Sequence, residues 1–175
     1  MQCLLDAQRR LGVQQTKKWS VVLSGAAIVA VSPNGELRGM TSTNGQPILV
    51  VEDQELLVKL YTSALERHGW AVHTAMREDD AFILFEKLNP PVVLSDYNLP
   101  NGNGISLLKR IKKHRPATEV VLISGFLTND QVCEALDEGA YQCLKKPSSL
   151  NVVTDVVAEA LHKTIKERTL SAAED

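Results

Sequence analysis

The sequence predicts an α/β fold over residues 46–168, in which helices cover both faces of a doubly wound five-stranded parallel sheet. Three observations lead to this prediction. From Gln46 onward, short apolar runs alternate with amphipathic stretches five times. Most of the runs are continuous, as expected for parallel strands that are buried on both faces. Polar side chains follow the runs, at the end of the sheet where such folds bind ligands.

The first strand–helix unit follows Gln46. Ile48–Val51 is an uninterrupted apolar run and predicts a buried strand. Gln54–His68 predicts a helix that ends at Gly69, because glycine is the usual residue just past a helix. The apolar side chains of this helix share one stripe at helical spacing: Leu57, Leu60, Tyr61, Ala64 and Leu65.

The second and third units lie on either side of a proline pair. Trp70–Ala75 alternates poorly and predicts an edge strand, and Glu78–Leu88 predicts a helix that ends before the prolines. Val92–Leu94 predicts a central strand, and Ile105–His114 predicts the helix after it. The residues of these two helices that we expect in the core are Ala81, Phe82, Phe85, Leu88, Ile105, Leu108 and Ile111.

The last two units complete the fold. Val120–Ile123 predicts the fourth strand, and Thr128–Glu138 predicts a polar helix that is closed by Gly139. Tyr141–Leu144 predicts the fifth strand. Ser149–Arg168 predicts the last helix, and residues 169–175 are expected to form a frayed tail. The inward side chains of the last helix are expected to be Val153, Val156, Val157, Ala160 and Leu161.

Residues 1–45 are expected to form an N-terminal extension, for which three interpretations stay open. Trp19–Val31 is mostly apolar and follows basic residues, which weakly favours a secretory signal, although no clear small-x-small cleavage site follows. A short β-hairpin or flexible leader is the second interpretation. We prefer the third, in which the biological start is Met40, because Met40 opens a polar lead-in to the first strand.

Composition argues against several classes of protein. The net charge is −2, from 19 basic and 21 acidic residues, and gives no electrostatic footprint for nucleic acid or an anionic membrane. No apolar run reaches the roughly 18 residues that a bilayer span needs. Cys3, Cys133 and Cys143 form no CxxC pair, which favours reduced thiols in a cytoplasmic protein.

Polar residues stand at the ends of four of the five predicted strands. Glu52 and Asp53 follow the first strand, Asp96 follows the third, Ser124 ends the fourth, and Lys146 follows the fifth. Because the carboxyl ends of parallel strands meet at one end of the sheet, we expect these side chains to converge.

Converging carboxylates repel one another, and a hard divalent cation with oxygen ligands relieves that repulsion; Mg²⁺ fits best. Lys146 supplies a compact ammonium for a phosphoryl oxygen or for Asp96 itself, and Ser124 can donate a hydrogen bond. A carboxylate nucleophile, a cation and a lysine together predict phosphoryl transfer. Asp96 is the predicted acceptor, because it lies centrally in the sheet.

Each motif alone has an ordinary structural explanation. An acidic pair after a strand is usually a solvated loop or a helix N-cap, and Asp96 before Pro100 and Gly102 fits simple turn chemistry. Four such accidents on the carboxyl ends of successive strands are far less expected than one shared site.

Four segments carry a resemblance to a known family. They are Ile48–Gln54, Val92–Pro100 with Gly102 and Gly104, Val121–Gly125, and Gly139-Ala140 through Lys146-Pro147. With these motifs in this order, residues 46–168 resemble the response-regulator receiver domains of two-component signalling, including the chemotaxis-type receiver. The resemblance implies the flavodoxin-like (βα)5 form of the doubly wound sheet.

The resemblance also implies roles for individual residues. Glu52 and Asp53 would help to bind Mg²⁺, Asp53 more directly, and the backbone carbonyl of Asn98 would complete the metal site with Asp96. Asp96 would accept the phosphoryl group. Ser124 would be the switch hydroxyl and Lys146 the phosphate-binding lysine.

One position departs from the family. Three residues before the lysine, receivers usually carry a Tyr or Phe whose ring changes exposure on activation, and here that position is Cys143. A small thiol is expected simply to pack. Tyr141, which we expect on the same strand face, is a speculative substitute that lies further from the site.

The implied function is that of a phosphorylation-activated response regulator of a two-component phosphorelay, which signals by protein–protein interaction. It would be no enzyme beyond its own phosphoryl transfer and autodephosphorylation. The donor would be a histidine kinase or histidine phosphotransfer protein that docks on the first helix of the domain. The target would be a separate protein that binds the face of the fourth helix, fifth strand and fifth helix, with no direct nucleic acid or membrane contact.

Two other classes of function stay open. One is a phosphorylation-independent, receiver-like binding module. The other is a small phosphohydrolase with an aspartyl-phosphate intermediate. Such enzymes want a second acid two residues after the nucleophile, where this chain has Asn98, and a substrate-capping insertion, which the sequence does not show.

Overall fold

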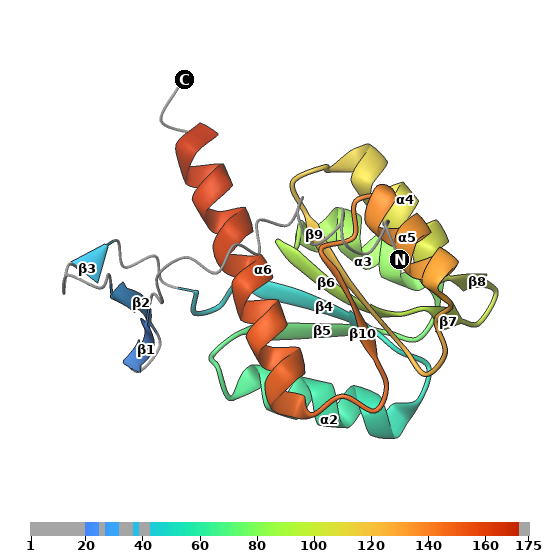
Figure 1. Cartoon of the computed structure of the whole chain (residues 1–175), viewed down its shortest axis with the longest axis horizontal. Coiled ribbons are helices and arrows are strands. Elements are labelled where there is room, and N and C mark those ends of the chain that lie inside the picture. Colours follow the sequence, from blue (N-terminus) through green and yellow to red (C-terminus); the bar gives the residue numbers. More distant parts are fainter. Residues whose placement is uncertain (1–19, 25–26, 32–36, 39–42, 172–175) are drawn as a thin grey trace. The chain divides into compact units, whose positions relative to one another are not determined.

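The structure is a computed structural model that describes residues 20–24, 27–31, 37–38 and 43–171 (Figure 1). The chain divides into two compact units, Met1–Asn44 and Gly45–Asp175. In the first unit, β1 (Ser20–Ser24), β2 (Ala27–Val31) and β3 (Leu37–Arg38) form an antiparallel sheet.

These strands agree with the β-hairpin interpretation of the N-terminal extension. Met40, residues 1–19 and the end of the tail, 172–175, lie outside the described residues. Among the residues that the structure describes, no helix combines the length and apolar character that a bilayer crossing needs.

A five-stranded parallel sheet forms the centre of the second unit, with the strand order β10-β9-β6-β4-β5. The predicted parallel sheet is therefore confirmed, and β5 is an edge strand as expected. The strands are β4 (Pro47–Val51), β5 (Ala71–Ala75), β6 (Val92–Asp96), β9 (Glu119–Ser124) and β10 (Gln142–Lys145).

Helices cover both faces of this sheet, which makes it doubly wound (Figure 1). The helices are α2 (Glu55–Glu66), α3 (Glu78–Leu88), α4 (Gly104–His114), α5 (Asn129–Asp137) and α6 (Leu150–Ser171). A small antiparallel pair, β7 (Asn98–Leu99) and β8 (Gly102–Asn103), lies between β6 and α4.

Two hydrophobic clusters hold the layers together. One packs the sheet against α3, α4 and α5, and the other packs it against α2 and α6. Successive residues of β4 and β6 alternate between the two clusters; Leu49 faces the first and Val50 the second. Because both faces are buried, the central strands read as continuous apolar runs.

Several details differ from the sequence prediction. Leu60 is 41% exposed, so the buried stripe of α2 is narrower than the spacing indicates. The last helix runs to Ser171, three residues past the expected end at Arg168. Cys143 carries a free thiol, as expected.

Strand β9 begins one residue earlier than predicted, at a buried carboxylate. Glu119 is 3% exposed, and its two oxygens pair with Lys163 at 2.5 Å and Lys112 at 3.4 Å. The two ammonium groups compensate the loss of hydration that would otherwise exclude a charged residue from a buried strand. The sequence around Glu119 does not predict that Lys112 and Lys163 pair with it.

The core prediction can be tested on one helix with two variants. Phe85 is fully buried between α3 and the sheet, whereas Ile83 on the same helix is 63% exposed. Phe85→Ala should lower the free energy of unfolding by about 3–5 kcal/mol. Ile83→Ala should change it by no more than about 0.5 kcal/mol. Urea denaturation measures both, and equal losses would contradict this packing.

Candidate functional site

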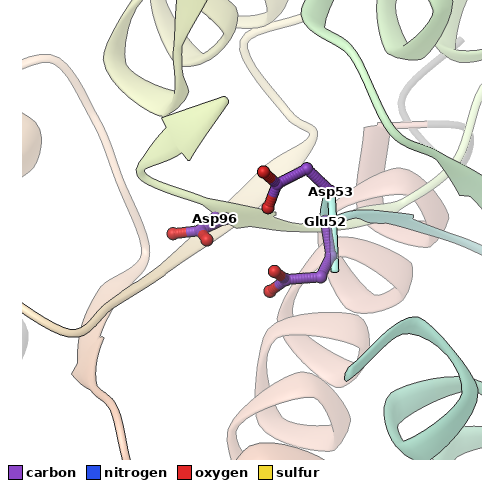
Figure 2. A group of neighbouring side chains, drawn as sticks. All are labelled: Glu52, Asp53 and Asp96. Carbon is purple, nitrogen blue, oxygen red and sulfur yellow. The ribbon is translucent and has the colours of Figure 1, made fainter. Parts of the chain in front are cut away.

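Three carboxylates meet at the carboxyl end of the sheet (Figure 2). Glu52 and Asp53 follow β4, and Asp96 is the last residue of the neighbouring strand β6. One oxygen from each carboxylate lies within 4.8 Å of the other two. Glu52 and Asp96 are buried and Asp53 is half-buried, so two of the three charges have lost most of their hydration. The predicted convergence of these residues is found.

Lys146 joins this group from the end of β10. Its Nζ donates to Glu52 Oε2 at 2.6 Å and to Asp96 Oδ2 at 2.8 Å. Lys146 thus contacts two of the three carboxylates, and these four groups, when ionised, carry a net charge of −2 (3 negative, 1 positive). Removing Lys146 would leave both buried carboxylates without this ammonium partner.

The pKa shifts reflect this arrangement. Burial raises the pKa of Glu52, and the hydrogen bond and charge of Lys146 only partly oppose that rise. For Lys146, burial acts to lower the pKa, but hydrogen bonds to Asp96 and Glu52 outweigh burial and the pKa is raised. Lys146 therefore stays a cation, while ionised Glu52 is held at a cost to the fold.

Backbone contacts fix the position of Asp96. The Asn98 N–H donates to Asp96 Oδ1 at 3.2 Å, and the Tyr97 N–H donates to the carbonyl of Ile123 on β9 at 2.9 Å. The Gly104 N–H donates to the Tyr97 carbonyl at 2.7 Å. A side chain at position 104 would place its Cβ 2.6 Å from the Asp96 carbonyl oxygen, so this close approach requires glycine.

Ser124 ends β9 beside Asp96, and its hydroxyl is engaged locally. Ser124 is fully buried; its Oγ donates to the Phe126 carbonyl at 3.1 Å and accepts from the Phe126 N–H at 3.3 Å. The hydroxyl thereby closes a turn that precedes α5. Phe126 itself is 90% exposed.

Cys143 and Tyr141 pack on opposite faces of the sheet. Cys143 is half-buried against the cluster of α3, α4 and α5, whereas Tyr141 packs against the cluster of α2 and α6. The expectation that both share one strand face is wrong, because Tyr141 lies just before β10 begins, where strand alternation does not hold. Tyr141 is therefore no substitute for an aromatic residue at position 143.

Sequence reasoning missed one link between the site and α5. Gln131 Nε2 donates to the Tyr97 hydroxyl at 2.9 Å, and Gln131 Oε1 accepts from the Thr128 N–H at 2.9 Å. The Gln131 N–H donates to Thr128 Oγ1 at 3.2 Å, which completes a capping box at the start of α5. The Thr128-x-x-Gln131 spacing is a readable signal of that box, but its contact with Tyr97 is not.

The model of the response regulator receiver domain family matches residues 48–158, which is more than half of the chain. The chain belongs to the response regulator receiver domain family. The matched range lies within the predicted domain of residues 46–168 and includes all the receiver site positions named above.

The receiver is similar to several known proteins. It is 32% identical over 122 residues to the regulatory protein AtoC of Escherichia coli K12, covering 70% of this chain and 26% of AtoC. It is 30% identical over 149 residues to the sensor histidine kinase RcsC of Salmonella typhimurium LT2, covering 83% of this chain and 16% of RcsC. The chain thus spans much less than two thirds of either relative.

A crystal structure of a response regulator receiver domain protein from Clostridium thermocellum shares the fold. Its TM-score is 0.65 at 26% identity, and the match covers 71% of this chain and 98% of that one. The shared extent agrees with a complete receiver fold in the second unit of this chain.

The burial of Cys143 has a chemical consequence. Burial raises the pKa of its thiol from 9.0 to about 11. The thiolate is the form that reacts, so iodoacetamide at pH 8 should modify Cys143 roughly 100-fold more slowly in the folded protein than in urea. Peptide mass spectrometry separates Cys143 from the other cysteines. Equal folded and unfolded rates would show that Cys143 is not packed as described.

Proposed function

We propose that this receiver is a phosphorylation-activated response regulator that accepts a phosphoryl group on Asp96 with Mg²⁺ bound beside it. The observation that carries the proposal is the meeting of three carboxylates and Lys146 at the carboxyl end of the sheet. Asp96 is the acceptor in this proposal, because it is the residue that lies next to both Lys146 and the acidic pair.

The donor set fits Mg²⁺. Carboxylate oxygens are ligands that this hard cation prefers, and the excess of negative charge favours a divalent ion. We propose that Glu52, Asp53 and Asp96 hold the ion together with the backbone carbonyl of Asn98, Asp53 more directly than Glu52. When bound, Mg²⁺ would supply positive charge that stabilises the oxygens of the transferred group.

The chain's own residues account for the transfer. One oxygen of the Asp96 carboxylate attacks the phosphorus, and the bond from phosphorus to the donor's imidazole nitrogen breaks. The electron pair of that bond stays on the imidazole, which is thereby regenerated. Lys146 already donates to Asp96 Oδ2 and would follow the new charge by contacting a phosphoryl oxygen. Hydrolysis of the phosphorylated Asp96 would release inorganic phosphate and restore the free carboxylate.

Phosphorylation would alter the start of α5 by two routes. A phosphoryl oxygen would draw the Ser124 hydroxyl away from its turn with Phe126. Movement of the Asp96 loop would also pull on Tyr97, whose hydroxyl accepts from the α5 capping residue Gln131. A protein partner that prefers the shifted form would read the change in population.

The partners follow from the same proposal. A histidine kinase or histidine phosphotransfer protein would supply the phosphoryl group, which the similarity to part of a sensor histidine kinase supports. A separate downstream protein would read the switch, with no direct nucleic-acid or membrane contact by the receiver. We propose the cytoplasm as the place where these proteins meet.

The experiment is phosphorylation by acetyl phosphate, followed by Phos-tag gel mobility, with and without Mg²⁺. The wild type should give a shifted band only with Mg²⁺, and Asp96→Asn should lose it because the amide is not a nucleophile. Asp79→Asn, an exposed carboxylate outside the site, is the control and should behave as wild type.

A shift that survives in Asp96→Asn would contradict Asp96 as the acceptor. No shift in the wild type, repeated with a histidine-kinase donor, would favour the phosphorylation-independent binding module instead.

A further inference from the structure

A buried carboxylate of α3 lies outside the acidic site and binds the loop that follows Asp96. The side chain of Glu78 is 8% exposed, and its Oε1 accepts from Ser106 Oγ at 2.8 Å and from Arg110 Nη1 at 3.0 Å. Its Oε2 accepts from the Asn103 N–H at 3.3 Å. One side chain of α3 therefore ties down both β8 and the first turns of α4.

The loop leaves room for this carboxylate because it has a glycine. A Cβ at position 102 would lie 1.9 Å from Glu78 Oε2, so any side chain there would displace the carboxylate or the loop. The carboxylate of Glu78 thus occupies the space that a side chain at position 102 in β8 would otherwise fill.

A short path leads from Glu78 to the acceptor. Asn103, which donates to Glu78, pairs with Asn98 across the β7–β8 hairpin. The Asn98 N–H donates in turn to Asp96 Oδ1. The backbone carbonyl of Asn98 is also the one that the proposed function assigns to the metal. The placement of Asn98 therefore depends on a contact made by α3.

The neighbouring charges make a clean control available. Arg110 also pairs with Asp79 at 3.1 Å and lies over the Phe82 ring at 4.1 Å, so it keeps two contacts when Glu78 is removed. Asp79 is 80% exposed, and within the described residues its carboxylate contacts the same arginine rather than the loop. Asp79→Ala thus removes the ion pair between Asp79 and Arg110 and leaves the contacts of Glu78 with the loop intact.

We propose that Glu78 is a positioning residue for the phosphoacceptor loop: it holds the β7–β8 hairpin so that the backbone of Asn98 faces the metal site. The part that concerns Mg²⁺ rests on the proposed function. The part that concerns the hairpin does not, because it depends only on contacts within the described residues.

The first test is an NMR titration of the full chain with MgCl₂. Glu78→Ala should weaken Mg²⁺ binding by about tenfold, the low end of the loss seen when groups behind metal ligands are removed, and Asp79→Ala should leave it within about twofold. At saturating Mg²⁺, Glu78→Ala should reach nearly wild-type phosphorylation by acetyl phosphate, because the acceptor chemistry is intact. A role in stability alone would not lower the Mg²⁺ affinity while leaving phosphorylation at saturating Mg²⁺ nearly unchanged.

The second test is amide hydrogen exchange without Mg²⁺. Exchange at Asn98 and Asn103 should be at least about tenfold faster in Glu78→Ala than in Asp79→Ala, because the Asn103 amide loses its charged acceptor. Gly102→Ala should speed exchange likewise in the wild-type background. It should add less in the Glu78→Ala background, where the 1.9 Å contact with Oε2 is removed and only the Cβ of residue 78 remains, at 3.2 Å. Glu78→Gln, which keeps the side-chain volume, should fall between the two and replaces Glu78→Ala if that variant does not fold.

Failure of the proposed function and failure of the positioning role of Glu78 would give different results. Wild-type protein that neither binds Mg²⁺ nor accepts phosphate would defeat the proposed function, and hydrogen exchange would still test the hairpin. A folded Glu78→Ala with the Mg²⁺ affinity and exchange rates of Asp79→Ala would overturn the positioning role.

Discussion

The contact of Lys146 with Glu52 and Asp96 is the interaction on which the site depends. It joins the ends of three strands, because Glu52 follows β4, Asp96 ends β6 and Lys146 follows β10. Two buried carboxylates would be very costly without this ammonium, and the ammonium alone does not balance three of them. The negative charge that Lys146 does not compensate favours the binding of a cation at this site.

The parallel sheet makes this contact possible. Its order places β4 and β6 side by side at the centre, and the chain turns outward from them in both directions. Loops after the central strands therefore open at one point, where α/β sheets hold their ligands. The same loops connect directly to the helices. Under the proposed function, a change at Asp96 would therefore reach α5 through Ser124 and Tyr97, and Glu78 of α3 contacts the loop that follows Asp96.

Much of this could be predicted from the sequence, because it depends on local patterns. Continuous apolar runs predicted the buried strands, and the polar residues that follow these runs indicated the site. Exposure of Leu60, the opposite faces of Tyr141 and Cys143, and the burial of Glu119 could not be predicted. The burial of Glu119, for example, depends on Lys112 and Lys163, whose pairing with it the local apolar pattern does not reveal.

The central claim is that the carboxylates outnumber the one ammonium and therefore bind a divalent cation. Isothermal titration of Mg²⁺ at pH 8 into wild type, Lys146→Met and Asp53→Asn tests it most directly. Two unit charges about 4 Å apart interact by about 4 kcal/mol at an effective dielectric of about 20, so removing the nearby positive charge in Lys146→Met should make Mg²⁺ bind at least about tenfold more tightly. Asp53→Asn should bind it more weakly than wild type. No binding by wild type, or loss of binding in Lys146→Met, would contradict this account of the site.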